Sequence, residues 1–409
     1  MTGTDVAAQN AARPKDAEAP NGELRGAAAV FAAVGIMLVA ANLRPAVVSV
    51  GPLLDTISED QGFSSAAAGL LTTLPVLFFG LSAPVAPRLA ARFGIERTIF
   101  GSLILLLAAI VLRLVPNVAA LFAGSMAVGG AIGVCNVVLP ALIKRDFAHR
   151  SGMMTGLYSM TLSGGAAVAA GVTVPIDDAL GGNWRLTLAV WAVLAVVALV
   201  QWVPQLRRVH TVSGDSGSGG LYRDRTAWAI TVYMGAQSLI FYTFGAWLPT
   251  YLLDRGMTHG AAGTTLALGQ VAGLLTSLTA PMIAGRMRDQ RPIALAFLVF
   301  CAVGFIGLVS TDAAPLLWVC LVMMGPGSGI SLALLFMVLR SNSTAQTGQV
   351  SGMAQSIGYG LAAVGPILIG AVHDASGSWN LAMGALALAV VPQAWSALRA
   401  ARPGRMRAD

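Results

Sequence analysis

The sequence predicts an all-α integral membrane protein in which twelve transmembrane helices form two pseudo-symmetric six-helix bundles. Hydrophobic residues make up 56% of the 409 residues and charged residues only 11%, which is outside the usual range for a soluble domain. Twelve apolar segments of about 20 residues, the length that crosses a bilayer as a helix, follow one another along the chain. Features of the first six segments recur in the last six, which indicates a duplicated bundle.

The first 25 residues are expected to form a disordered cytoplasmic tail. They mix acidic and basic side chains with alanine and show no apolar periodicity. Such a composition cannot bury enough apolar surface to fold. A cleaved signal peptide is not expected, because the first apolar run begins only at Ala27 and is long enough to span a membrane.

The twelve predicted spans are separated by turn-forming residues such as Pro116, Asn117 and the Gly-Gly-Asn run at 181–183. The predicted spans of the first half cover about residues 27–54, 66–87, 98–115, 119–143, 152–175 and 185–204. Those of the second half cover about residues 227–252, 261–284, 293–310, 315–339, 350–372 and 379–398.

The distribution of basic residues predicts the orientation of the chain. If the tail is cytoplasmic, only Arg44, Arg113, Arg185 and Arg255 of the 25 Lys and Arg residues are intramembrane or external. Basic residues concentrate in cytoplasmic loops, so both termini of this multi-pass protein are expected in the cytoplasm. Most basic residues are interpreted as orientation signals, and Arg113 and Arg255 are expected to snorkel to the outer surface.

Short repeated sequences divide the chain into two halves. Ser-Gly-Met opens the fifth span of each half, at 151–153 and 351–353. Gly-x-Trp precedes the sixth span of each half, at 182–184 and 377–379. The predicted parts are a tail at 1–25, bundles at 26–206 and 226–399, a Gly/Ser-containing cytoplasmic linker at 207–225 and a cytoplasmic tail at 400–409.

Several function classes lack their motifs. Neither Lys15 nor Lys144 follows a glycine, which excludes a Walker A nucleotide site. The histidines show no metal-ligand spacing, and no span contains His-Glu-x-x-His or Gly-x-Ser-Gly, so neither a metal site nor an enzyme is expected. Gly-Asp-Ser-Gly at 214–217 matches a protease motif by letters alone, because a Gly/Ser linker cannot orient a catalytic triad. The net charge is +7, but the basic residues lie between apolar segments, so nucleic-acid binding is not expected.

Arg44 is the charged residue that the predicted fold accommodates least easily. It lies in the apolar stretch 27–54, which contains no carboxylate. A guanidinium cannot lose its charge, and at a bilayer centre it costs roughly 2.5–3.5 kcal/mol on insertion scales. An anionic ligand is therefore expected to meet it; the alternative partners are backbone carbonyls freed by Pro45. Asn42 lies nearly opposite Arg44 and is expected to bond a neighbouring helix.

Binding of a small anion requires one fixed charge, a few amide or hydroxyl donors, and aromatic walls that exclude water. Helical phase places Gln237 with Phe241 on one stripe, and Gln355 with Tyr359 on another. Asn136 is a further amide within a span. The alternatives are interhelical hydrogen bonds for the amides and ordinary packing for the aromatic residues.

Five segments together form a specific pattern. They are Asn-Leu-Arg-Pro at 42–45, Gly-Pro-Leu-Leu at 51–54, Asn136 with the run at 139–147, Gly-Leu-Tyr-Ser-Met at 156–160, and 351–359, which contains Ser-Gly-Met-Ala-Gln-Ser and Gly-Tyr. In these segments the chain resembles the major facilitator superfamily and, more narrowly, its cyanate and 2-nitroimidazole transporter family. The resemblance covers nearly everything after residue 25.

The resemblance implies a secondary active transporter that moves a small anionic or planar polar solute across the inner membrane by alternating access. Such a solute would be similar to cyanate, a nitroimidazole or a small carboxylate. The expected partners are this solute and the lipid bilayer, with no cofactor and a monomeric chain. Two alternatives remain, a broad-specificity drug exporter of the same fold and a non-transporting membrane receptor. The predicted substrate contacts are Arg44, which meets the solute charge, with Asn136, Tyr158, Gln237, Phe241, Gln355 and Tyr359.

The coupling ion is left open by the sequence. All 18 acidic residues lie in tails, in loops or at span ends, whereas proton-driven transporters usually carry a titratable group within the membrane. A proton could travel with a weak-acid solute, or Asp55 or the pair His373 and Asp374 could bind it at the outer mouth, or transport is not proton-coupled. Arg340, at the cytoplasmic end of the tenth span, is either an anion gate or a topology anchor.

Overall fold

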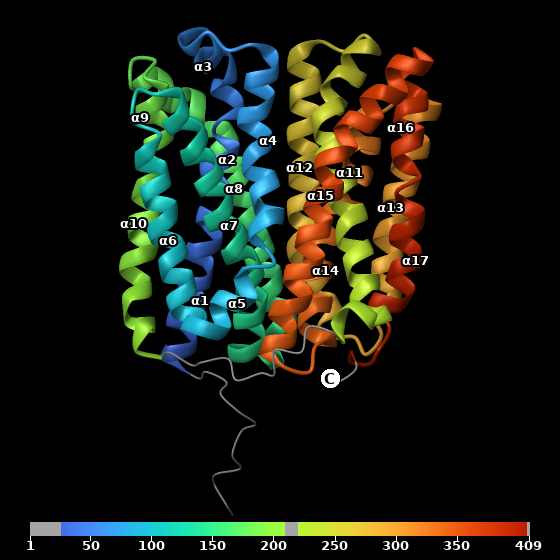
Figure 1. Cartoon of the computed structure of the whole chain (residues 1–409). Coiled ribbons are helices and arrows are strands. Elements are labelled where there is room, and N and C mark those ends of the chain that lie inside the picture. Colours follow the sequence, from blue (N-terminus) through green and yellow to red (C-terminus); the bar gives the residue numbers. More distant parts are fainter. Residues whose placement is uncertain (1–25, 209–219, 407–409) are drawn as a thin grey trace, which may run out of the picture.

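A computed structural model describes residues 26–208 and 220–406. Within these residues the chain forms helices and no strands. Figure 1 shows two groups of helices side by side, from α1 to α10 and from α11 to α17, with both ends of the described chain at the same end of the molecule. The predicted all-α membrane fold is confirmed. The predicted tail at 1–25 and most of the predicted linker at 207–225 lie outside the described residues.

Each predicted span of the first half corresponds to one helix or to a short series of helices. The series are α1 (Ala27–Asn42), α2 (Pro45–Val48), η1 (Gly51–Leu53) and α3 (Leu54–Gln61); α4 (Ser65–Ser82) and α5 (Ala86–Phe93); and α9 (Trp184–Ala189), α10 (Trp191–Trp202) and η3 (Val203–Arg208). The remaining helices are α6 (Ile95–Leu112), α7 (Val118–Asp146), η2 (Ala148–Arg150) and α8 (Ser151–Ala179).

The second half is more regular. After η4 (Leu221–Arg223) it contains α11 (Arg225–Asp254), α12 (His259–Ala284), α13 (Arg291–Ser310), α14 (Pro315–Arg340) and α15 (Thr344–Ser376). Its last span is divided into α16 (Trp379–Ala387) and α17 (Val390–Ala400).

Helix α11 shows why apolarity alone undercounts the spans. Ten candidate spans in the described part of the chain are long and apolar enough to cross a membrane, and the pair α4 and α5, bent by 54°, makes eleven. Helix α11 is the remaining predicted span. Its polar residues Thr231, Gln237 and Thr243 are buried, because they face neighbouring helices and not lipid.

The first span is broken at the residue that the sequence singles out. Helix α1 ends at Asn42, and Arg44 precedes α2 with φ −127° and ψ −40°. Pro45 cannot donate a hydrogen bond to the carbonyl of Ala41, and α8 packs against this carbonyl through Gly165, where a Cβ would lie 3.1 Å from the oxygen. The break places Arg44 outside a regular helix.

The side chain of Asn42 secures the end of α1. Its Nδ2 donates to the carbonyl of Leu38 at 2.8 Å and to that of Leu194 in α10 at 3.2 Å. The predicted bond from Asn42 to a neighbouring helix is confirmed.

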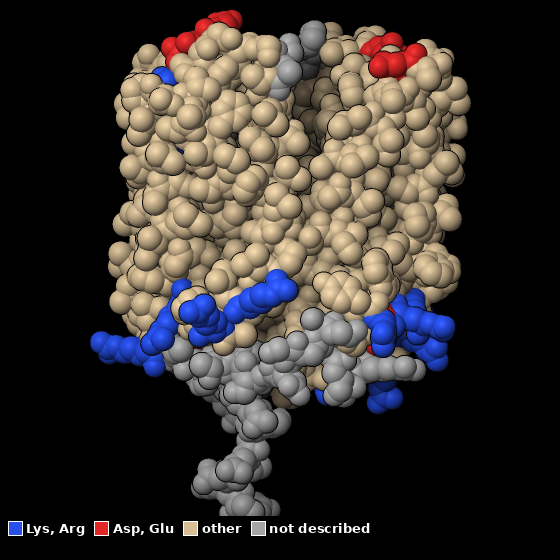
Figure 2. Space-filling model, viewed as in Figure 1, with Lys and Arg blue, Asp and Glu red and all other residues tan. Residues whose placement is uncertain are grey.

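Charge separates the two ends of the molecule. In Figure 2, most Lys and Arg atoms gather at one end and most Asp and Glu atoms at the other. We call these the basic end, where α5 lies, and the acidic end, where α3 lies. Figure 2 also shows the surface hollowed between the two halves at the acidic end.

At the basic end the two halves pack closely through the repeated Ser-Gly-Met sequence. A Cβ on Gly152 of α8 would lie 2.9 Å from the Cα of Gly285, which follows α12. A Cβ on Gly352 of α15 would lie 2.9 Å from the carbonyl oxygen of Ala83, which follows α4. Such distances leave no room for a side chain, so both contacts require glycine.

Within the second half, α12 and α14 cross at Gly273 and Gly327. A Cβ on Gly327 would lie 2.6 Å from the Cα of Gly273, so Gly327→Ala forces the helices apart. Overpacking of this kind costs about 1–3 kcal/mol, and we expect the melting temperature of the purified protein to fall by several degrees. Gly263→Ala in α12 is the control, because its Cβ would meet nothing within 4 Å. Equal melting temperatures for the two variants would contradict this packing.

Candidate functional site

Arg44 joins the two halves of the molecule. Its Nη1 donates to the hydroxyl of Tyr242 in α11 at 2.7 Å, and its guanidinium lies 5.8 Å from the ring centroid of Phe79 in α4. The residue is only 9% exposed. Tyr242 accepts this bond as a neutral hydroxyl, so the charge of Arg44 is not neutralised by its hydrogen-bond partner.

The surroundings of Arg44 are aromatic and uncharged. Its guanidinium lies beside the ring of Phe79 and the hydroxyl group of Tyr242, and the ring of Tyr359 packs edge-on against both of these residues. Within residues 26–208 and 220–406, no carboxylate forms an ion pair with Arg44. A cation so enclosed and without a counterion is a natural place for an anionic or acceptor-rich ligand.

Aromatic rings from both halves form the walls around this charge. Tyr359 of α15 meets Phe79 of α4 edge-on, with ring centroids 5.5 Å apart, and meets Tyr242 at 6.4 Å. Phe241 meets Tyr242 edge-on at 5.3 Å. Four rings from α4, α11 and α15 thus follow one another beside Arg44, and such surfaces favour flat ligands.

A second set of hydrogen bonds joins α7, α8 and α15. The hydroxyl of Tyr158 donates to Oδ1 of Asn136 at 3.2 Å. Nε2 of Gln355 donates to the backbone carbonyl of Asn136 at 2.9 Å and to Oγ of Ser351 at 2.8 Å. Nδ2 of Asn136 is buried and has no hydrogen-bond partner among the described residues. It is therefore a free donor next to the hydroxyl group of Tyr158.

Most of the predicted contact residues are thereby brought together. Arg44 bonds Tyr242, whose ring packs against those of Phe241 and Tyr359, while Asn136 joins Tyr158 and Gln355 in the second set of hydrogen bonds. We call Arg44, Phe79, Asn136, Tyr158, Phe241, Tyr242, Gln355 and Tyr359 the Arg44 cluster.

Gln237 lies elsewhere. Its Nε2 donates to Oγ of Ser238 at 2.6 Å and to Sδ of Met234 at 3.3 Å. A Cβ on Gly329 of α14 would lie 2.9 Å from the Cβ of Gln237, so Gln237 packs inside the second half. Helix α11 contacts helices on several sides, and helical phase alone cannot tell which polar face points to the other half.

Two members of the cluster were not predicted. Tyr242 directly follows Phe241 in the sequence, and a stripe drawn through Gln237 and Phe241 leaves it out. Phe79 lies in a uniformly apolar stretch of α4, where no sequence signal distinguishes it from packing residues. The signal that could have identified Tyr242 is its hydroxyl group, which lies next to Phe241 in a mostly apolar part of α11.

The four residues considered for gating or coupling lie in different parts of the molecule. Asp55 is exposed in the first turn of α3. His373 lies 3.4 Å from Asp374 and stacks on Trp379 with centroids 3.9 Å apart, at the C-terminal end of α15. Arg340 donates to the carbonyls of Ala400 and Ala401, each at 2.9 Å, and to Oε1 of Gln290. Arg340 thus connects the end of α14 to the end of α17.

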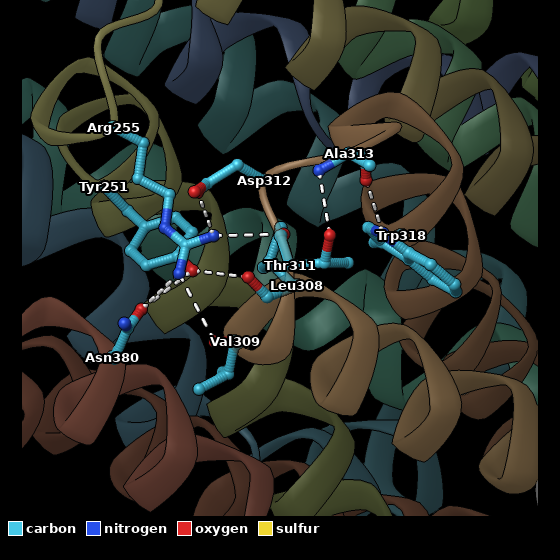
Figure 3. Close-up of polar contacts among 9 residues, drawn as sticks. All are labelled: Tyr251, Arg255, Leu308, Val309, Thr311, Asp312, Ala313, Trp318 and Asn380. Carbon is cyan, nitrogen blue, oxygen red and sulfur yellow. Dashed lines mark hydrogen bonds and ion pairs between the residues drawn. The ribbon is translucent and has the colours of Figure 1, made fainter.

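Arg255 is held at the acidic end by several helices. Figure 3 shows its guanidinium between Asp312 and Asn380, with Tyr251 beside it. It forms an ion pair with Asp312 at 2.7 Å, and it donates to Oδ1 of Asn380 at 2.7 Å and to the carbonyl of Thr311 at 3.1 Å. These bonds connect α11 with the ends of α13 and α16.

Arg113 does not snorkel. Its side chain is buried, with 1% exposed, and it donates to the carbonyl of Ala46 at 2.7 Å. The expectation that Arg113 reaches the outer surface is wrong, because the break in the first span leaves an inward carbonyl that its side chain can bond. Arg113 thus bonds the carbonyl of Ala46 in the broken first span, whereas the carbonyl that Pro45 frees is that of Ala41.

The described residues contain no group of three or more His, Cys, Asp or Glu side chains that could hold a metal ion. What the Arg44 cluster offers a ligand is one fixed positive charge, hydrogen-bond donors from an amide and tyrosine hydroxyls, and flat aromatic walls.

The bond between Arg44 and Tyr242 predicts a measurable effect of Tyr242→Phe. Removing the hydroxyl leaves a buried guanidinium without its hydrogen-bond partner, and bonds to charged groups contribute about 1.5–3 kcal/mol. We expect the melting temperature of the ligand-free protein to fall by several degrees. Tyr222→Phe is the control, because Tyr222 is 56% exposed. An unchanged melting temperature for Tyr242→Phe would show that the bond contributes little.

Comparison with proteins of known sequence shows close relatives that are transporters. The chain is 39% identical over 361 residues to "Uncharacterized transporter YycB" of Bacillus subtilis, covering 87% of this chain and 90% of that protein. It is 38% identical over 389 residues to "2-nitroimidazole transporter" of Escherichia coli, covering 94% and 98%. It is 33% identical over 363 residues to "Cyanate transport protein CynX" of Escherichia coli, covering 87% and 93%. The predicted resemblance to the cyanate and 2-nitroimidazole transporter family is confirmed.

Comparison with solved structures supports the fold. The E. coli fucose:proton symporter FucP superimposes with a TM-score of 0.72 at 14% sequence identity, covering 91% of this chain and 98% of that chain. Residues 28–366 match the Major Facilitator Superfamily. The relatives and the family are transporters and not enzymes, and the chain belongs to the Major Facilitator Superfamily.

Proposed function

We propose that this protein is a secondary active transporter that moves a small, planar, anionic or acceptor-rich solute across the inner membrane, with Arg44 as its main charge contact. The observation that carries the proposal is the bond from Arg44 to a neutral Tyr242 across the two halves, with no carboxylate paired to the guanidinium in the described residues. A buried cation without a counterion binds an anion more favourably than it binds a cation or an apolar molecule.

The donor set supports the solute class. The guanidinium of Arg44 can only donate hydrogen bonds. Nδ2 of Asn136 is a second, buried donor, without a partner among the described residues. Nitro, carboxylate and cyanate groups are small and rich in acceptors, and they fit between flat rings such as those of Phe79 and Tyr359. The names of two relatives, a 2-nitroimidazole transporter and a cyanate transport protein, agree with this class.

The arrangement of the halves supports alternating access. Because basic residues favour the cytoplasm, we infer that the basic end is cytoplasmic and that both termini lie there. The hollow at the acidic end then opens outward, while the contacts of Gly152 and Gly352 hold the halves together on the cytoplasmic side, beside a cavity lined by Arg88, Ala141 and Gly348. Rocking the bundles 26–206 and 226–399 about the Arg44 cluster would expose the solute to each side in turn. Superfamily members need no cofactor, and we propose that the chain acts as a monomer.

The two alternatives make different predictions. A broad-specificity drug exporter should carry bulky lipophilic cations, which the fixed charge of Arg44 repels. A receptor should bind the solute without moving it. Measuring both flux and binding with the same purified protein distinguishes each alternative from the proposal.

The test uses purified protein in proteoliposomes loaded with unlabelled solute. Uptake of labelled cyanate, benzoate, 2-nitroimidazole and a lipophilic cation is compared with binding of the same compounds in detergent, measured by thermal stabilisation. We expect exchange of at least one anion or nitroimidazole and none of the cation. Binding without exchange would favour the receptor, and exchange of the cation alone would favour the exporter. Repeating the uptake with an imposed pH gradient shows whether a proton accompanies the solute.

A further inference from the structure

Arg113 carries a charge that the structure leaves uncompensated. It follows the last residue of α6, and its Nη1 donates to the carbonyl of Ala46 in the broken first span. Its Nε and Nη2 are buried and have no hydrogen-bond partner among the described residues. A Cβ on Gly124 of α7 would lie 2.8 Å from the Cγ of Arg113, so α7 covers the side chain. The guanidinium is enclosed by α6, α7 and the first span.

No carboxylate in the described part of the chain forms an ion pair with Arg113. An arginine stays protonated even when it is desolvated, so the charge remains. The C-terminal end of α6 supplies only about half an elementary negative charge. A buried water molecule could satisfy the two free nitrogen atoms but carries no charge. An anion satisfies both requirements.

Ser49 provides a further donor on the same side of the first span. It lies three residues after Ala46, and residues at this spacing share one helix face. Its side chain is fully buried, and its Oγ has no hydrogen-bond partner in the part of the chain that the structure describes. Two guanidinium nitrogen atoms and one hydroxyl group are therefore unpartnered around the same turn of the chain.

We propose that Arg113 and Ser49 bind one small monovalent inorganic anion, such as chloride, inside the first half and apart from the Arg44 cluster. The bound anion compensates the charge of Arg113 and steadies the broken first span, in which Ala46 lies two residues after Arg44. The proposal does not depend on which solute the protein transports, because Arg113 is not a member of the Arg44 cluster.

The test is the melting temperature of the full-length purified protein as bromide replaces gluconate at constant pH and ionic strength. A ligand of the native state raises the melting temperature with a saturating concentration dependence. We expect bromide to raise it by a few degrees in the wild type and equally in Arg44→Ala. In Ser49→Ala, which keeps the charge, we expect the half-saturating concentration to rise several-fold, and in Arg113→Met we expect the bromide effect to disappear.

Crystals grown in bromide provide a second measurement, independent of the variants. We expect an anomalous scattering peak within hydrogen-bond distance of Nη2 of Arg113. A wild type that does not respond to bromide, an unchanged response in Arg113→Met, or ordinary water density at this position would overturn the proposal. A response that is lost in Arg44→Ala would assign the anion to the Arg44 cluster, which overturns this inference while leaving the proposed transport function intact. If Arg113→Met does not fold, Ser49→Ala and the crystal decide.

Discussion

Transport of small anions is expected to fall by about 30-fold or more when Arg44 is replaced by alanine. Removing one member of a buried, hydrogen-bonded charge pair costs about 2–5 kcal/mol, and a tenfold change corresponds to about 1.4 kcal/mol. The loss should appear mainly as weaker solute binding, because the fixed charge is the only cation that the described part of the cluster contains. Uptake of labelled anion into proteoliposomes measures the effect.

Two further variants show whether the charge or the geometry of Arg44 matters. Arg44→Lys keeps the charge but loses the planar fork of donors, so we expect activity between that of the wild type and that of Arg44→Ala. Arg92→Ala removes an exposed arginine at the basic end and should transport normally. Normal transport by Arg44→Ala would assign this residue a structural role and favour the drug-exporter alternative.

The second large effect is expected at the basic end, from Gly152→Leu or Gly352→Leu. Neither position has room for a side chain while the halves are in contact there. Overpacking of about 1–3 kcal/mol shifts the equilibrium between the two arrangements roughly 5- to 150-fold toward the one that is open at the basic end. Transport requires both arrangements, so we expect exchange to be nearly lost while the protein remains folded.

Matched controls exist in the same two helices. A Cβ on Gly171 of α8 or on Gly360 of α15 would meet nothing within 4 Å, so leucine at either position should preserve exchange. Opening is measured with a thiol reagent on Ala83→Cys in a background without native cysteines, because Ala83 lies fully buried against Gly352 at the contact between the halves. Unchanged labelling of this cysteine in Gly352→Leu would argue against steric opening.

The sequence predicts the order and approximate bounds of the spans because most of them carry a long apolar surface. It predicts their local shape less well. Pro45 indicates a distortion, but whether it bends or breaks the helix depends on neighbours such as Gly165 and on the hydrogen bond that Arg113 donates to the carbonyl of Ala46. The second span likewise continues through the 54° bend between α4 and α5, which packing against α15 stabilises.

The sequence identifies those residues of the candidate site whose side chains are unusual in a membrane span, and it misses those whose side chains are common there. A charge inside an apolar stretch identifies Arg44 without any structure. Helical phase brought out Gln355 and Tyr359, whose face of α15 meets the other half. The same reasoning selected Gln237 and omitted Tyr242, because phase defines relative directions around α11 and not which direction faces Arg44.

The unbalanced charge of Arg44 has an electrical consequence for the proposed cycle. The empty carrier holds one positive charge between its halves, and the carrier loaded with a monovalent anion is neutral there. Moving a full charge across a membrane changes the free energy by about 2.3 kcal/mol per 100 mV. Membrane voltage therefore acts on the return of the empty carrier and hardly on the loaded step, so an applied potential sets net flux while leaving one-for-one anion exchange nearly unaffected.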